Sequence, residues 1–221
     1  MLVALAGSCR DAAAKPQRAP RALSYDEAIA LLKQPKRWCE AAAALVKLGA
    51  RPDARPGDSR AIGPLVRVAM LTEEGLPDRS CVRDALERLG IHEQAARLVD
   101  SAEAADRRTG IRMMEAFPSA GQAPILARVA LQDPERELRA LAAHALRFQR
   151  ITAAWDTAMM ALLDAGDSDL RELAATALAY RFDPAILAAL RKRLGTETDA
   201  AVRAALTAAI RVQHDRAAPR P

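Results

Sequence analysis

Arginine is the residue type whose spacing in this chain could support recognition chemistry. Four arginines stand at positions 107, 139, 171 and 203, so each is 32 residues from the next, and an acid precedes each by four positions. The series is Arg107, Arg139, Arg171 and Arg203, with the acids Glu103, Glu135, Asp167 and Asp199. A guanidinium group can bind a phosphate or a carboxylate through two parallel hydrogen bonds. An acid four residues before an arginine on a helix, however, forms a favourable ion pair. We therefore expect a structural ladder that fixes the register between repeats, made of the pairs Glu135–Arg139, Asp167–Arg171 and Asp199–Arg203.

Further arginines lie outside this register and are better candidates for binding a partner. They are Arg136, Arg147, Arg150 and Arg181. We expect them to be unpaired and to form an exposed basic surface, although charged residues on a helix often do no more than contact water.

The residues that usually carry catalysis or bind metals are too scattered to form a site. A metal site needs several ligands that converge on one point, whereas the histidines stand far apart, at His92, His144 and His214. No serine lies in a nucleophile-elbow sequence, and no glycine-rich phosphate loop occurs. We therefore expect no metal, no cofactor and no enzymatic activity.

The cysteines and tryptophans each allow two interpretations. Cys39 and Cys81 fall at nearly equivalent places in two predicted helices. A disulfide is conceivable if the protein is exported, but packed helices lie ~8–10 Å apart and free cysteines are commonly buried, so we expect two buried thiols. Trp38 and Trp155 could stack on a base, but each lies in an apolar helical pattern and is expected to be a packing residue.

The elements that position these residues are predicted to be helices. Hydrophobic residues make up 51% of the chain and aromatic residues 3%, so the apolar mass is mainly alanine and leucine, which favour helices. A capping box at Ser24 to Glu27 marks the start of the ordered region, and glycine and proline mark its turns. The pattern predicts six helical hairpins, with helices at 25–33 and 35–49, then at 59–72 and 78–89, followed by hairpins at 92–117, 122–148, 152–181 and 184–213.

One repeat departs from this pattern. The second helix of the third hairpin has Gly110 where the later repeats have Ala142, Ala174 and Leu206. Glycine inside a helix costs about 0.5–1 kcal/mol relative to alanine. The third hairpin is therefore either loosely packed or the site of a close contact between helices.

The units at 133–146 and 167–178 resemble HEAT repeats of the short bacterial type related to phycobilisome lyases. Both have a turn aspartate, then an apolar residue followed by arginine, then small residues and leucine at helical spacing. The resemblance covers roughly residues 24–213 and is most specific at 133–210. It implies a right-handed α-solenoid whose second helices line the inner face, and a binding scaffold more often than an enzyme. A constant repeat length of this size independently indicates a solenoid.

The two ends of the chain fall outside the repeat domain. Residues 1–9 resemble the end of a bacterial lipoprotein signal, with Cys9 as the lipidation candidate, but the chain lacks the basic residues that normally precede the apolar part. Residues 10–23 have the composition of a flexible basic linker, and residues 214–221 that of a flexible tail. We expect either a membrane-anchored periplasmic lipoprotein or a cytoplasmic protein, with membrane attachment only through Cys9.

The sequence therefore favours a non-enzymatic scaffold that binds another protein through the face formed by its second helices. The net charge of +5 and the isoelectric point near 9.5 allow an alternative, a nucleic-acid-binding protein resembling the HEAT-like DNA alkylation glycosylases. We expect nucleic acid not to be the partner, because no basic run is interleaved with stacking aromatic residues. A chromophore lyase is a third interpretation that depends only on the repeat family.

Overall fold

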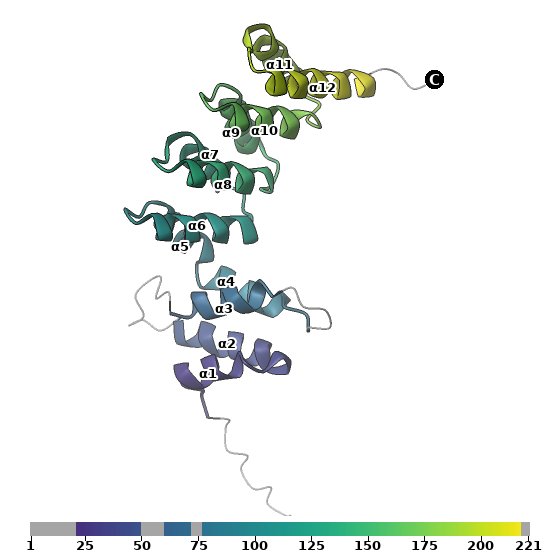
Figure 1. Cartoon of the computed structure of the whole chain (residues 1–221). Helices are drawn as coiled ribbons and strands as arrows, with labels where there is room; N and C mark the ends of the chain where they lie inside the picture. Colours follow the sequence, from purple (N-terminus) through teal and green to yellow (C-terminus); the bar gives the residue numbers. More distant parts are fainter. Residues whose placement is uncertain (1–20, 50–59, 72–76, 218–221) are drawn as a thin grey trace, which may run out of the picture.

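The computed structural model describes residues 21–49, 60–71 and 77–217 of the chain. Within these residues the protein consists of helices and irregular connections, and it contains no strand. The prediction of an all-α protein is therefore confirmed. The helices, shown in Figure 1, are α1 (Tyr25–Leu31), the 3-10 turn η1 (Pro35–Arg37), α2 (Trp38–Gly49), α3 (Ile62–Ala69), α4 (Ser80–Arg88), α5 (Ile91–Val99), α6 (Ala104–Ala116), α7 (Ala123–Gln132), α8 (Arg136–Arg147), α9 (Ala153–Leu163), α10 (Ser168–Leu178), α11 (Pro184–Thr196) and α12 (Ala200–Ala217).

Consecutive helices pair as hairpins, and the hairpins follow one another in an elongated row (Figure 1). The pairs run from α1 with α2 to α11 with α12. Even-numbered helices also contact each other across hairpins, in the series α2–α4, α6–α8, α8–α10 and α10–α12. From α5 onward, one period of the sequence corresponds to one hairpin.

A single hydrophobic cluster runs along this row, from Ala28 in α1 to Ala209 in α12. The apolar residue that follows each repeated arginine by seven positions is fully buried at Met114, Leu146 and Leu178. Burying one such side chain contributes about 1.5–3 kcal/mol. The hairpins are therefore held together mainly by apolar burial, and polar contacts set their register.

Side-chain caps begin several of the helices, and one of them is the predicted capping box. Glu27 N donates to Ser24 Oγ at 3.3 Å and Ser24 N donates to Glu27 Oε2 at 2.7 Å, so the predicted capping box is present. Thr152 caps α9 by accepting from Trp155 N, and Asp183 caps α11 by accepting from Ala185 N. These caps satisfy backbone N–H groups that have no partner inside the helix.

The second and third hairpins meet at a tight turn. Gly90, with φ of 79°, connects α4 directly to α5 in a left-handed conformation that favours glycine. Arg83 of α4 reaches the end of α6, where its Nη1 donates to Ala116 O at 3.4 Å and its guanidinium lies 5.3 Å from the centre of the Phe117 ring.

The irregular third hairpin contains a close helix contact. Gly110 is buried in α6, and a Cβ atom added there would lie 2.7 Å from Ala95 O and 2.8 Å from Val99 N. Both atoms belong to the backbone of α5. Of the two interpretations of Gly110, close packing is therefore confirmed.

The prediction of two buried thiols is wrong, because Cys39 and Cys81 form a disulfide that joins the first turns of α2 and α4. Their Cα atoms are 5.4 Å apart, well inside the spacing expected of average helix pairs. The alanines one turn further along, Ala42 and Ala85, are buried. Such small side chains allow two helices to approach closely at this point.

Two other predictions concern the connections and the ends. The helix α12 continues to Ala217, so the predicted boundary at 213 is four residues too early. The predicted extended connection at 50–58, the linker at 10–20 and the lipidation candidate Cys9 lie outside the described residues.

Candidate protein-binding surface

Each repeated arginine anchors the turn that precedes its own helix. One guanidinium nitrogen, Nη1, donates to the backbone carbonyls of the residues five and six positions earlier, at 2.8–3.3 Å. These carbonyls belong to Ser101 and Ala102 for Arg107, to Asp133 and Pro134 for Arg139, and to Ala165 and Gly166 for Arg171. Arg203 makes the equivalent bond to the Glu197 carbonyl at 2.9 Å. These bonds satisfy carbonyls close to the end of the first helix of the hairpin, which have no partner inside that helix.

The other edge of the guanidinium binds a carboxylate of the next hairpin in two of the repeats. Arg107 donates from Nε and Nη2 to Asp133 at 2.8 and 3.2 Å, and Arg171 donates from the same atoms to Glu197 at 2.8 and 3.0 Å. Both carboxylates are buried and stand in the turn between the two helices of the next hairpin. Bidentate bonds of this kind combine strength with a fixed orientation.

The Glu197 carboxylate has the densest set of partners. The pKa of Glu197 is held far below its usual value, chiefly because Arg171 donates to it, and further because the Asp199 backbone N–H and Arg193 also donate to it. The pKa of Arg171 is raised in turn, chiefly by the same hydrogen bond to Glu197. This pair is therefore charged throughout the physiological pH range.

The predicted ladder pairs are wrong in detail. Within the described residues, none of these arginines forms an ion pair with the acid four positions earlier. Arg107 and Arg171 pair instead with acids of the next hairpin. The earlier acids Glu135 and Asp167 are N-cap residues with extended backbones, and Asp199 accepts from Ala201 N and Val202 N. Asp167 and Asp199 accept from backbone N–H groups at the start of their helices, and Glu135 lies 3.9 Å from Arg107 of the preceding hairpin, so these acids are used elsewhere.

The ladder is incomplete at two places. In the 32-residue register, the position of the carboxylate is occupied by Ser101, Asp133, Ala165 and Glu197. The partner position of Arg139 is Ala165, which has no carboxylate, so Nε and Nη2 of Arg139 have no acidic partner among the described residues. The same edge of Arg203, in the last described hairpin, also has none.

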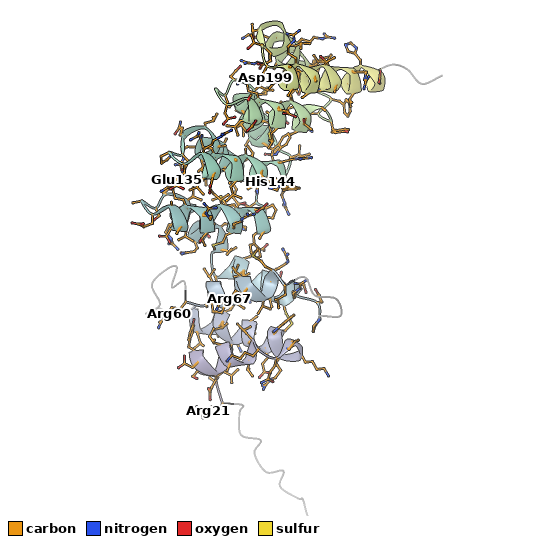
Figure 2. The ribbon with its side chains drawn as sticks, in the orientation of Figure 1. Arg21, Arg60, Arg67, Glu135, His144 and Asp199 are labelled. Atoms are coloured by element: carbon orange, nitrogen blue, oxygen red, sulfur yellow. A yellow bond between two sulfur atoms is a disulfide. The ribbon has the colours of Figure 1, made fainter. Side chains whose placement is uncertain are left out.

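The charges along the second helices largely neutralise each other. Arg108 pairs with Glu137 at 3.0 Å, and His144 Nδ1 lies 3.0 Å from Glu115, so α6 and α8 are linked twice. Figure 2 shows Glu135 and His144 at opposite ends of α8. Arg136 continues the series, because it donates to Asp169 of α10 at 3.2 Å. The middle of this face therefore offers a partner few free charges.

The predicted binding arginines divide into two groups. Arg136 pairs with Asp169, and Arg181 donates to both oxygens of Asp156 at 2.7 and 2.6 Å, which raises the pKa of Arg181. The expectation that these two are unpaired is therefore wrong. Arg147 and Arg150 are exposed and have no acidic partner among the described residues, and the guanidinium of Arg147 lies 6.0 Å from the centre of the Phe148 ring.

Large apolar side chains are exposed beside these two arginines. Phe148 is 53% exposed and Ile151 59% in the turn after α8, and Tyr180 is 71% exposed and Phe182 44% in the turn after α10. We call this set, together with Arg147 and Arg150, the aromatic edge. Aromatic residues are only 3% of the chain, and three of them are exposed in the equivalent turns of two adjacent hairpins. Exposed apolar groups that cluster in this way are typical of interaction sites.

Polar contacts of one buried and one partly buried side chain hold the two turns of the aromatic edge in place. The side chain of Gln149 is buried, donates to Met114 O at 3.0 Å and accepts from Ser119 N at 3.3 Å. The ion pair between Arg181 and Asp156 links the turn after α10 to α9, the helix that follows the turn after α8. The aromatic side chains therefore project from a fixed backbone.

Sequence reasoning missed the apolar part of this surface, although the sequence carries a signal for it. Phe148 and Tyr180 are 32 residues apart, at positions 148 and 180, and each stands two residues after the last fully buried leucine of its helix, Leu146 or Leu178. A large apolar residue just past the end of a buried stripe is a sign of exposure.

The other residues considered for chemistry have structural roles. Trp38 and Trp155 are buried and donate from Nε1 to Leu32 O and Leu146 O, both at 2.9 Å, so the prediction that they are packing residues is confirmed. The three histidines contact different partners, namely His92 with Gln122, His144 with Glu115 and His214 with Arg191. No group of His, Cys, Asp or Glu in the described part of the chain could hold a metal ion.

Comparisons with known proteins do not add a family. No protein-family model matches the chain, and no curated protein sequence matches it. Among the helices of residues 21–49, 60–71 and 77–217, none combines the length and the apolar character that crossing a membrane requires.

Proposed function

We propose that this protein is a non-enzymatic HEAT-repeat scaffold, a right-handed α-solenoid that binds another protein. The aromatic edge is the observation that carries the proposal. It combines exposed aromatic and aliphatic side chains with two arginines that have no acidic partner among the described residues, on a backbone held by side-chain hydrogen bonds. The few residues that dominate the binding energy of protein interfaces are enriched in tyrosine and arginine.

The location of the binding surface follows from the charges. The second helices bring the surface together, but Arg108 and Arg136 at its centre are paired with acids of the next hairpin. The partner therefore binds where the second helices end, and it carries an acidic segment with apolar side chains. A preformed surface of this kind avoids the entropy cost of ordering flexible loops on binding.

The nucleic-acid alternative receives less support. Binding in the manner of HEAT-like glycosylases would place Trp38 or Trp155 beside an open groove, whereas both rings are buried. The exposed arginines adjoin aliphatic side chains as well as rings, which suits a protein partner better than stacked bases.

The disulfide between Cys39 and Cys81 supports export to an oxidising compartment, because disulfides persist there and are rare in the cytosol. It agrees better with the expected periplasmic lipoprotein than with a cytoplasmic protein. Mass spectrometry of protein from the native cell tests both features: a disulfide-linked chain with a lipid on Cys9 supports the assignment, and free thiols with an unmodified N-terminus contradict it.

A comparative pull-down tests the proposed function. The full chain is immobilised beside the variants Phe148→Ser with Tyr180→Ser, and Arg147→Glu with Arg150→Glu. Matched controls are Leu131→Ser and Lys192→Glu, which change an exposed apolar and an exposed basic residue away from the aromatic edge. The proposal predicts a protein partner that both edge variants lose and both controls keep.

Two outcomes contradict the proposed function. One is a partner that all edge variants retain at wild-type strength. The other is the absence of any protein partner together with retention of duplex DNA that weakens steeply with salt, which is the signature of phosphate binding.

A further inference from the structure

The outward face of α12 is a second surface with a defined geometry. Arg203, Ala204, Thr207, Ala208 and Arg211 line an open hollow of about 370 Å³ on this helix. We propose that this face docks an acidic helical hairpin of another polypeptide, which continues the arginine ladder of the row. The surface is separate from the aromatic edge, so the proposal goes beyond the proposed function.

The repeat register identifies this face as a stacking face. The positions that correspond to Thr207 in the two preceding hairpins are Ala143 and Ala175, and both are fully buried. Arg171, which corresponds to Arg203, is also buried, whereas Thr207 and Arg203 are exposed. In the earlier hairpins these positions are covered by the next hairpin, and no described residue covers them on α12.

Two pairs inside the molecule show what Arg203 would bind. Arg203 donates Nη1 to the carbonyl of Glu197 at 2.9 Å, as Arg107 and Arg171 do in their own turns. That bond leaves Nε and Nη2, the edge with which Arg171 holds Glu197 at 2.8 and 3.0 Å. Where the covering turn carries an acid, as for Arg107 and Arg171, this edge binds it, so the ligand that fits Arg203 is a carboxylate in the turn between two helices. Arg211, at the same hollow, adds a second positive charge.

Charge excludes a second copy of this chain as the occupant. In a head-to-tail stack, the turn between α1 and α2 of the second copy would lie opposite Arg203. That turn carries Lys33 and Lys36 and has no acid, while its Arg37 is paired with Glu40 of α2, so the two lysines would face Arg203. Desolvating an unpaired guanidinium beside further positive charges is unfavourable. The occupant is therefore a different polypeptide with Asp or Glu in its turn.

A cleavable fusion tests the proposal with a defined probe. The full chain is followed by a flexible Gly/Ser linker with a protease site and by a second full chain in which Lys36→Glu places a carboxylate in the turn between α1 and α2. The matched probe carries Lys36→Ala in the second copy only. After cleavage, gel filtration measures how much of the probe stays bound to the chain.

The expected result is retention of the Glu probe and about tenfold weaker retention of the Ala probe, which corresponds to about 1.4 kcal/mol. Arg211→Gln in the host chain also weakens retention of the Glu probe, and Lys192→Gln on the neighbouring α11 has no effect. Arg211 makes no hydrogen bond to another described residue, so this variant changes the face without removing a contact of the fold. Arg203→Gln abolishes the difference between the two probes.

The proposal is overturned if the probe is released whatever its charge, or if the Glu and Ala probes are retained equally. Phe148→Ser with Tyr180→Ser leaves retention unchanged, because the aromatic edge takes no part. Failure of the α12 face is thus distinguishable from failure of the proposed function.

Discussion

Gly110 allows a sharp test of how closely the third hairpin is packed. The prediction concerns Gly110→Ala, which adds one methyl group in the middle of α6. The new Cβ would lie 2.7 Å from Ala95 O and 2.8 Å from Val99 N. Because both atoms are backbone, they can move away only if α5 itself is displaced from α6.

Two opposing effects set the change in the free energy of unfolding caused by Gly110→Ala. Forcing an extra carbon into a closely packed contact costs about 1–3 kcal/mol, and backbone contacts place this case at the upper end. Replacing glycine with alanine inside a helix contributes about 0.5–1 kcal/mol in the other direction. We therefore expect a net destabilisation of about 1–2.5 kcal/mol.

Urea unfolding followed by circular dichroism measures this difference. Gly195→Ala is the matched control, because Gly195 is also helical and has no atom within 4 Å of an added Cβ. The control is expected to be as stable as the wild type or up to about 1 kcal/mol more stable. The same substitution should thus have opposite effects at the two sites. A Gly110→Ala protein that is as stable as the Gly195→Ala protein would refute the close contact.

Other expected outcomes concern the disulfide and the arginine ladder. Cys39→Ala with Cys81→Ala should lower the free energy of unfolding by about 4 kcal/mol, the loop entropy for a bridge between residues 42 positions apart, as measured by urea unfolding. Glu197→Gln should destabilise the protein at pH 7. The difference in the free energy of unfolding between this variant and the wild type should shrink as the pH falls below 4.5, the usual pKa of a glutamate side chain. The reason is that protonation of Glu197 removes the stabilisation that its lowered pKa gives the wild type. Ala165→Asp should add a carboxylate for Arg139 and raise the free energy of unfolding by about 0.5–1.5 kcal/mol.

Each of these outcomes has a control and a contrary result. Reducing agent should destabilise the wild type but not the double cysteine variant; equal effects on both would show that the disulfide is not responsible. Glu172→Gln, at an exposed residue of α10, should leave the pH dependence unchanged, and a deficit of Glu197→Gln that is constant from pH 7 to about pH 3 would contradict the lowered pKa. Ala165→Asp should lose its benefit when combined with Arg139→Gln. If it keeps the benefit, the added carboxylate does not act through Arg139.

The periodic part of the fold was readable from the sequence because a hairpin has one recurring apolar stripe. The position represented by Met114, Leu146 and Leu178 is buried each time, and the turn residues between these stripes mark where helices end. Helical periodicity depends on neighbours along the chain, so the pattern contains the information directly.

Contacts between hairpins could not be predicted in the same way. The expected partner of Arg171 was Asp167, but Asp167 is an N-cap residue, and the actual partner, Glu197, is 26 residues later. Asp167 instead accepts from Asp169 N at the start of its own helix, a local contact that competes with the predicted ion pair. The disulfide depends likewise on how closely α2 and α4 approach, which average helix spacing does not specify.

The arginines of this chain differ in which contacts a partner would have to break in order to bind them. Arg171 is buried and holds Glu197 and two backbone carbonyls, so a partner that engaged it would have to break a contact between hairpins. Removing one member of a buried pair leaves the other charge uncompensated, which is strongly unfavourable. Arg147 and Arg150 have no acidic partner among the described residues, so a partner can bind them without breaking an ion pair, and they adjoin exposed apolar side chains that gain by being covered. A partner can therefore bind at the aromatic edge without disturbing the stack, and recognition at this surface leaves the spacing of the hairpins unchanged.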